Sequence, residues 1–215
     1  MKSGIFFPII ALIILCTISV GQPAKSKGTT PPMQTTPHSQ KEIAVLRTSM
    51  GTFEFELYRN DAPKTVENFV KLAGKKYFDG MRFHRVAKGF VIQTGDPNSK
   101  DPAKAASWGM GGESIYGKEF EDELDPRTPS AKEGYKKGVV AMANRGQNTN
   151  TSQFFVCLRD VNLPLKYTIF GKVVKGMDVV EKIGQVEIVG PTDSRPKKDV
   201  MLKKVTSRKE KGSSK

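Results

Sequence analysis

Apolar and polar residues alternate along the chain from about residue 42 in a pattern that indicates short β-strands. In segment 52–57, Phe53, Phe55 and Leu57 alternate with polar residues, which predicts a half-buried strand. The apolar run 43–48 precedes it across a short Ser-Met-Gly turn, so the pair predicts a hairpin. Six further segments have strand character, namely 81–86, 90–94, 138–144, 154–158, 168–174 and 200–205.

Two segments have the apolar spacing of helices instead. The first begins at Pro63 and ends at Gly74, and the second spans 177–183 before Gly184. Many short strands with few helices predict an antiparallel barrel or sandwich. Segment 96–135 is long, polar and rich in glycine and proline, so we expect an ordered, irregular loop with a functional role.

The first 21 residues have a different character from the rest of the chain. Lys2 is followed by an apolar run at 5–20 and then by Gly21, which predicts a secretory signal peptide cleaved after Gly21. Two alternatives stay open. The run is only a little shorter than the ~20 residues that span a bilayer, so an uncleaved segment would anchor the protein to a membrane. Cys16 would serve as a lipidation site. All three alternatives place the folded part outside the cytoplasm, as a periplasmic, secreted or membrane-anchored protein.

The remaining composition divides the chain into a linker, one domain and a tail. Residues 22–41 are rich in Pro, Thr, Ser and Lys and predict an extended linker. The domain is expected at 42–206, followed by a basic disordered tail at 207–215. Much of the formal net charge of +13 lies after residue 194. We interpret this basic end as a solvated terminus, with binding to anionic lipid, wall material or nucleic acid as the alternative.

The cysteine and histidine content argues against metal chemistry. The two cysteines are Cys16 and Cys157, and removal of the N-terminal segment would leave Cys157 without a disulfide partner. Cys157 follows a strand-like run, which predicts a buried, inert thiol. With His38 and His84 as the two histidines, the chain has no adequate zinc ligand set. We therefore expect no metal and no cofactor.

Three motifs carry the chemistry. Residues 83–96 are Phe-His-Arg-Val-Ala-Lys-Gly-Phe-Val-Ile-Gln-Thr-Gly-Asp, and residues 111–117 are Gly-Gly-Glu-Ser-Ile-Tyr-Gly. Residues 142–155 contain Met-Ala-Asn-Arg-Gly and end in Asn-Thr-Asn-Thr-Ser-Gln-Phe-Phe. In this order the motifs resemble the signature segments of cyclophilins, and the resemblance covers about 42–206. Tyr167, at a position often held by histidine, resembles exported bacterial members.

The resemblance implies an eight-stranded, antiparallel, closed β-barrel capped by two α-helices, with the active site in a groove on its outside. It implies peptidyl-prolyl cis/trans isomerase activity on X-Pro bonds of exported proteins, which assists their folding. The catalytic residues that it implies are Arg85, Gln93 and Asn144. The substrate-binding residues that it implies are Phe90, Val91, Ala143, Gln153, Phe155, Leu163 and Tyr167.

The chemistry of the reaction suits an arginine beside an apolar pocket. Amide resonance gives the X-Pro bond a rotational barrier of ~18–20 kcal/mol, and no covalent bond has to break. A guanidinium directed at the proline nitrogen stabilises the twisted state, in which that nitrogen gains a lone pair. This scheme predicts little pH dependence near neutrality, with His84 structural or lining the groove.

Two alternatives and one departure from the family pattern complete the prediction. A non-catalytic module that binds proline-containing segments would use the same pocket. A basic barrel that binds nucleic acid would need aromatic residues among exposed basic strands, so we expect no specific nucleic acid partner. Many cyclophilins have tryptophan where this chain has Asn162, and that tryptophan helps to hold cyclosporin, so we expect weak cyclosporin binding. We expect a monomer.

Overall fold

The computed structural model describes residues 41–210. The predicted signal peptide or anchor at 1–21 lies outside the described residues, as does all of the predicted linker except Lys41. Within the described range, no helix combines the length and the apolar character needed to cross a membrane.

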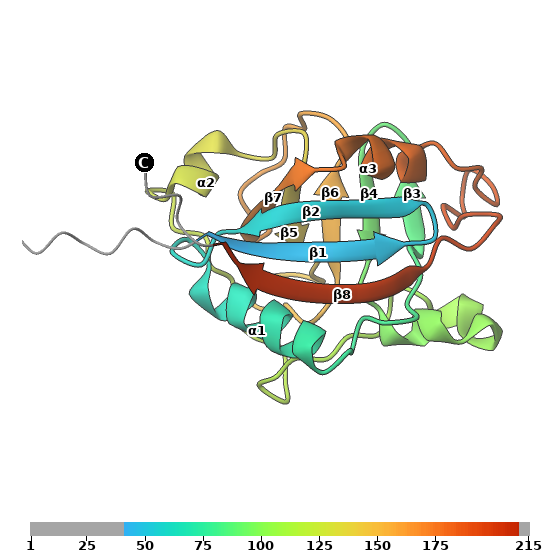
Figure 1. Ribbon diagram of the computed structural model, residues 1–215, viewed down its shortest axis with the longest axis horizontal. Coiled ribbons are helices and arrows are strands. Elements are labelled where there is room, and N and C mark those ends of the chain that lie inside the picture. Colours follow the sequence, from blue (N-terminus) through green and yellow to red (C-terminus); the bar gives the residue numbers. More distant parts are fainter. Residues whose placement is uncertain (1–40, 211–215) are drawn as a thin grey trace, which may run out of the picture. The chain divides into compact units, whose positions relative to one another are not determined.

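Eight strands form one antiparallel sheet in the order β3-β4-β6-β5-β7-β2-β1-β8. Figure 1 shows β8, β1 and β2 in front of β4, β5 and β6, so the sheet curls round on itself. The bounds are β1 Glu42–Thr48, β2 Gly51–Leu57, β3 Arg85–Ala87, β4 Val91–Thr94, β5 Val139–Met142, β6 Phe154–Cys157, β7 Ile169–Lys175 and β8 Leu202–Lys209. The predicted number of strands and the hairpin of β1 and β2 are confirmed.

The prediction of a closed barrel is wrong, because β3 and β8 lie at the two ends of the sheet without a ladder between them. The segments just before these strands meet at one isolated bridge, Arg82 to Met201. Around this bridge, the Leu202 N–H donates to the Met81 carbonyl at 2.7 Å and the Phe83 N–H donates to the Val200 carbonyl at 2.9 Å. The main chain of Arg82 points away from Met201: its N–H donates to Ser99 Oγ at 3.0 Å, and its carbonyl accepts from Thr94 Oγ1 at 2.9 Å. The sheet is therefore a curled half-barrel, and a few main-chain hydrogen bonds beside this bridge join its two edges.

The two predicted helices are present, and a third was missed. The helix α1 is Pro63–Gly74 and packs against β8, whereas α3 is Met177–Gly184 and packs against β2 (Figure 1). The missed helix, α2, is Pro129–Glu133. Five residues are too few to show a helical period, which is why the sequence pattern did not reveal it. The long segment also contains two 3₁₀ helices, η1 Pro97–Lys100 and η2 Pro102–Ser107.

The C-terminal boundary of the domain lies later than predicted. The strand β8 continues to Lys209, which pairs with Glu42 of β1. Residues 207–209 were assigned to a disordered tail because their composition is basic and polar. They are strand residues because their main chains complete the ladder with β1.

The inner face of the curled sheet encloses an aromatic core. Phe55 and Phe170 from the sheet meet Phe69 of α1, and Phe154 packs on the same group, with ring centroids 5.4–6.4 Å apart. All four side chains are buried. Because successive strand residues face opposite sides, this core fixes which neighbours point outward.

A second, smaller apolar cluster lies on the outer face of the sheet. Its buried members are Val91, Tyr135, Val139, Ala141, Phe155, Cys157 and Ile169. Cys157 is buried, as predicted, and burial raises the pKa of its thiol to about 12. This outer cluster forms the base of the candidate site.

Candidate active site

Strand register brings three of the predicted site residues to the outer face of the sheet. Arg85 of β3 lies opposite Gln93 of β4, and Gln93 lies opposite Phe155 of β6. Residues directly opposite each other in antiparallel strands share a face of the sheet. The three side chains therefore stand side by side on the outer face, away from the core.

A relay of amide side chains orients the Arg85 guanidinium. Arg85 Nη1 donates to Gln93 Oε1 at 3.2 Å, and Gln93 Nε2 donates to Gln153 Oε1 at 2.9 Å. Gln153 Nε2 donates in turn to the carbonyls of Gly109 and Gly111. Within residues 41–210, Arg85 forms no ion pair, so its charge is not neutralised by a carboxylate.

Nine of the ten predicted site residues line one cavity of about 230 Å³. They are Arg85, Phe90, Val91, Gln93, Ala143, Asn144, Phe155, Leu163 and Tyr167. The tenth, Gln153, lines an adjoining groove and reaches the cavity through its bond to Gln93. The cavity has an apolar wall and one cationic edge.

The apolar wall is held in place by tyrosine contacts. The Phe155 and Tyr167 rings meet edge to face with centroids 5.6 Å apart. The Tyr135 hydroxyl donates to the Tyr167 carbonyl at 2.9 Å and accepts from the Tyr167 N–H at 3.0 Å. Tyr135 is itself buried, so the position of Tyr167 is fixed from below.

At the rim of the cavity, the main-chain N–H and C=O of Asn144 have no hydrogen-bond partner among the described residues. Its side-chain Nδ2 donates to the Lys166 carbonyl at 2.8 Å, which fixes the segment. The preceding Ala143 N–H donates to the Gln153 carbonyl at 2.9 Å. Among the described residues, no hydrogen bond uses the N–H or the C=O of Asn144. An extended peptide could pair with these groups as an added strand does.

The adjoining groove contains residues that the sequence analysis did not assign to the site, although most of them lie in the quoted motifs. These are Gly109, Met110, Gly111, Gly112, Arg145, Thr149 and Thr151. The buried Asn68 of α1 ties two sides of this region together, because its Nδ2 donates to the Thr151 carbonyl at 2.7 Å and its Oδ1 accepts from Ile115 N–H at 2.9 Å. Gly112 has φ +156, and a Cβ there would lie 2.1 Å from Thr151 Oγ1. The glycine-rich run 109–117 was the signal that could have identified the groove.

His84 lies beside the site as a buried, uncharged residue. It is 4% exposed, and neither ring nitrogen has a hydrogen-bond partner among the described residues. Burial lowers its pKa from 6.5 to about 4, although the nearby Asp96 carboxylate raises the pKa. The imidazole is therefore neutral at neutral pH.

This pKa predicts that the free energy of unfolding depends on pH. The unfolded chain binds a proton at His84 below about pH 6.5, but the folded chain does so only below about pH 4. Stability is therefore complete above the unfolded pKa and falls as the pH drops toward the folded one, by on the order of 3 kcal/mol. Urea unfolding of wild type and His84→Gln across this window measures the difference. His38→Gln is the matched control and should keep the wild-type slope, whereas an unchanged slope in His84→Gln contradicts the prediction.

Comparison with known proteins identifies the family of this chain. The family model described as "Cyclophilin type peptidyl-prolyl cis-trans isomerase/CLD" matches residues 43–207. The chain therefore belongs to the cyclophilin family and is a peptidyl-prolyl cis-trans isomerase.

Individual relatives and solved structures agree as well. Peptidyl-prolyl cis-trans isomerase-like 1 of Neurospora crassa is 47% identical over 76% of this chain and 91% of that protein. The human protein of the same name is 46% identical over 73% of this chain and 87% of its own length. A cyclophilin of Cryptosporidium parvum is 31% identical, with a TM-score of 0.69 over 80% of this chain and 99% of that chain. The same protein solved in the presence of the dipeptide Ala-Pro gives a TM-score of 0.67 over 77% of this chain and 98% of that chain. These relatives are eukaryotic and do not support the expected bacterial-like character.

Proposed function

We propose that Arg85 accelerates X-Pro rotation without covalent chemistry, as an electrostatic catalyst at the edge of the apolar cavity. The observation that carries this proposal is the guanidinium itself, which is aimed by Gln93 and lacks a neutralising carboxylate within the described chain. Arginine stays charged and has several N–H donors, so one can hold Gln93 while others meet the substrate.

Some cavity residues would hold the substrate, and Arg85 would stabilise its twisted X-Pro bond. The Phe155 and Tyr167 rings, with Leu163, would hold the proline ring, while the main chain of Asn144 would pin the flanking peptide. As the bond twists, the proline nitrogen becomes pyramidal and its lone pair faces the guanidinium. This interaction is stronger in the twisted state than in the planar ground state, as catalysis requires. The Ala-Pro dipeptide used with the Cryptosporidium relative is a ligand of the size this cavity suits.

An isomerisation assay tests the proposal against its alternative. The protein should accelerate cis/trans exchange of an X-Pro peptide, followed by NMR exchange spectroscopy without a coupling protease. A non-catalytic binding module would instead shift the peptide resonances without raising the exchange rate. Because no participating group titrates near neutrality, the rate should stay nearly constant between about pH 6.5 and pH 8.

We also predict weak cyclosporin binding. Asn162 is exposed next to Leu163 of the cavity, so no indole covers this side of the pocket. Replacing Asn162 by Trp should raise cyclosporin affinity, measured by calorimetry, while leaving isomerase activity close to that of wild type. Nanomolar affinity of the wild-type protein would overturn this prediction.

We further infer that the protein acts outside the cytoplasm on exported, proline-containing chains. Support comes from the charged start and apolar run of residues 1–21. Mass measurement of the mature N-terminus tests export. Cleavage near Gly21 supports a secreted or periplasmic protein. An uncleaved N-terminus in the membrane fraction supports an anchor, and an uncleaved N-terminus in the cytoplasmic fraction contradicts the inference.

A further inference from the structure

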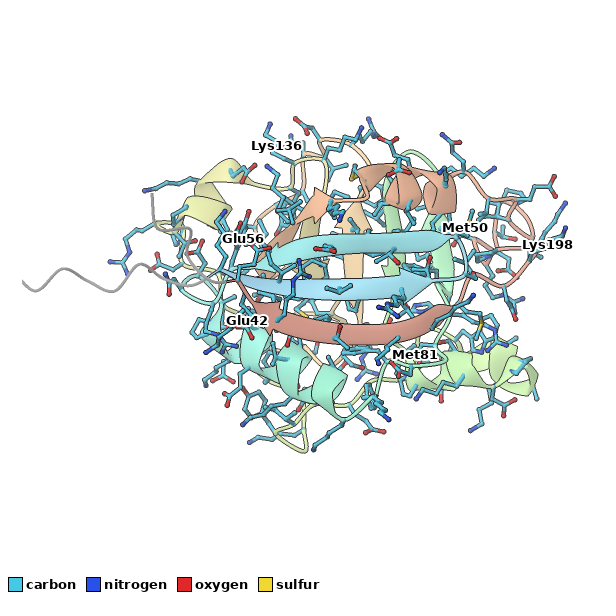
Figure 2. All side chains as sticks on the ribbon, viewed as in Figure 1. Glu42, Met50, Glu56, Met81, Lys136 and Lys198 are labelled. Carbon is cyan, nitrogen blue, oxygen red and sulfur yellow. The ribbon has the colours of Figure 1, made fainter. Side chains whose placement is uncertain are left out.

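A second cavity, of about 470 Å³, shares Arg85 and Gln93 with the proline cavity. One wall follows η2 and includes Trp108, and the other is the loop 192–195. Figure 1 shows η2 and the loop after α3 at the same end of the molecule, where Figure 2 labels Lys198. A substrate with its proline at Arg85 would therefore pass close to this second space.

The Trp108 wall is rigid. Two guanidiniums lie over the indole, with Arg82 Cζ 5.4 Å and Arg195 Cζ 5.7 Å from the ring centroid. Trp108 Nε1 donates to the Asp101 carbonyl at 3.1 Å, and Arg82 Nε is held by Asp199 Oδ2 at 2.6 Å. Stacking of guanidinium on indole is favourable, so the wall is formed before any ligand arrives.

The opposite wall is docked on the sheet. The N–H of Val86 in β3 donates to the Ser194 carbonyl at 2.8 Å. Arg195 Nε lies 2.8 Å and 2.9 Å from the two carboxylate oxygens of Asp193, so the side chains form a clamp within the loop. The loop therefore presents Arg195 and Asp193 in fixed positions next to Trp108.

The floor of the second cavity includes an unpartnered polar group. His84 lines it with both ring nitrogens unsatisfied among the described residues, although the side chain is 4% exposed. A neutral imidazole has one donor and one acceptor, and leaving both unpaired in a buried place costs free energy. A polar ligand group that enters the cavity could satisfy one of them.

The charge balance of the second cavity is positive. Asp193 neutralises Arg195, whereas Arg85 has no carboxylate partner within the described residues. The residues that line the cavity therefore carry one net positive charge, while the Asp96 carboxylate lies near His84 outside this lining. A carboxylate is attracted to such a place, and a cation is repelled.

We propose that this second cavity is a specificity subsite that takes a carboxylate side chain of the substrate, within about three residues of the isomerised proline. The two cavities share Arg85 and Gln93, so residues next to the proline are the ones that reach the second cavity, because an extended chain advances about 3.4 Å per residue. The proposal rests on the proposed function, since it needs the proline to occupy the cavity at Arg85. Such a subsite would make the enzyme prefer X-Pro segments that carry an acidic residue near the proline.

The test compares matched peptides. In a series of X-Pro peptides, Glu or Gln is placed at each position up to three residues before and after the proline. At one position, kcat/KM should be about 2- to 5-fold higher with Glu than with Gln, as partly exposed ion pairs allow. High salt should reduce the ratio. A ratio of one at every position overturns the proposal.

Substitutions in the clamp should move this ratio in opposite directions. Arg195→Gln leaves Asp193 unneutralised, so the Glu-to-Gln ratio should fall to one or below. Asp193→Asn frees the Arg195 charge, so the ratio should rise above that of wild type. The control is Arg127→Gln, because Arg127 forms the same clamp with Asp125 on an exposed loop. Ratios unchanged by both Arg195→Gln and Asp193→Asn overturn the proposal.

A binding measurement separates failure of the subsite from failure of the catalytic proposal. Trp108 is the only tryptophan in the chain, so its fluorescence reports on the second cavity directly. If no peptide is turned over but the Glu peptide shifts the fluorescence at a lower concentration than the Gln peptide, the subsite stands and the catalytic proposal fails. Equal midpoints for the two peptides overturn the subsite, whatever the rate of isomerisation.

Discussion

Arg85→Ala is expected to lower kcat/KM for X-Pro peptides by about 10²- to 10³-fold, the effect of removing one donor that stabilises transition-state charge. The physical reason is that the apolar wall still holds the proline ring while the twisted nitrogen loses its cationic partner. The loss should therefore appear mainly in kcat, with a small change in peptide affinity. Stability should change little, because within residues 41–210 the Arg85 side chain forms a hydrogen bond with Gln93 alone.

The measurement is the NMR exchange rate with wild type, Arg85→Ala and Arg85→Lys. Lysine keeps the charge but lacks the fork that holds Gln93 and the substrate together, so Arg85→Lys should recover only part of the activity. Arg47→Ala is the matched control, because Arg47 is an exposed strand arginine on β1. Equal exchange rates for wild type and Arg85→Ala would favour the non-catalytic binding module.

The sequence predicted the sheet well because alternation is a local property. Phe53, Phe55 and Leu57 had to face one side, and the structure buries all three. The site could be predicted for a different reason. Its residues lie in motifs that resemble cyclophilins, and strand register then brings Arg85, Gln93 and Phe155 together.

What the sequence could not predict depends on contacts between distant segments. The bridge beyond the end of β3 pairs the main chains of Phe83 and Val200, which lie far apart in the chain. The second cavity needs Trp108 and Arg195 to stack, although they are far apart in the chain. Neither contact leaves a periodic signal in composition or spacing.

The neighbours Phe154 and Phe155 should give opposite kinds of defect when each is replaced by alanine. Phe154 faces the core and packs against Phe55, Phe69 and Phe170, so Phe154→Ala should lower the free energy of unfolding by about 3–5 kcal/mol. Phe155 faces the proline cavity and packs against Tyr167. Phe155→Ala should cost less stability, since one side of its ring already borders open space.

For isomerase activity, we expect the larger defect in Phe155→Ala and the smaller one in Phe154→Ala. Removing the Phe155 ring takes away apolar surface that would bury the proline, so kcat/KM should fall by about 10-fold or more. The folded fraction of Phe154→Ala should keep kcat/KM near that of wild type, because Phe154 does not line the cavity. Urea unfolding measures the first effect and peptide exchange measures the second. An equal loss of activity per folded molecule in both variants would contradict this prediction. The core-facing Phe154 and the cavity-facing Phe155 would then not have separate roles in stability and in activity. The outer face would then not act as an independent binding surface.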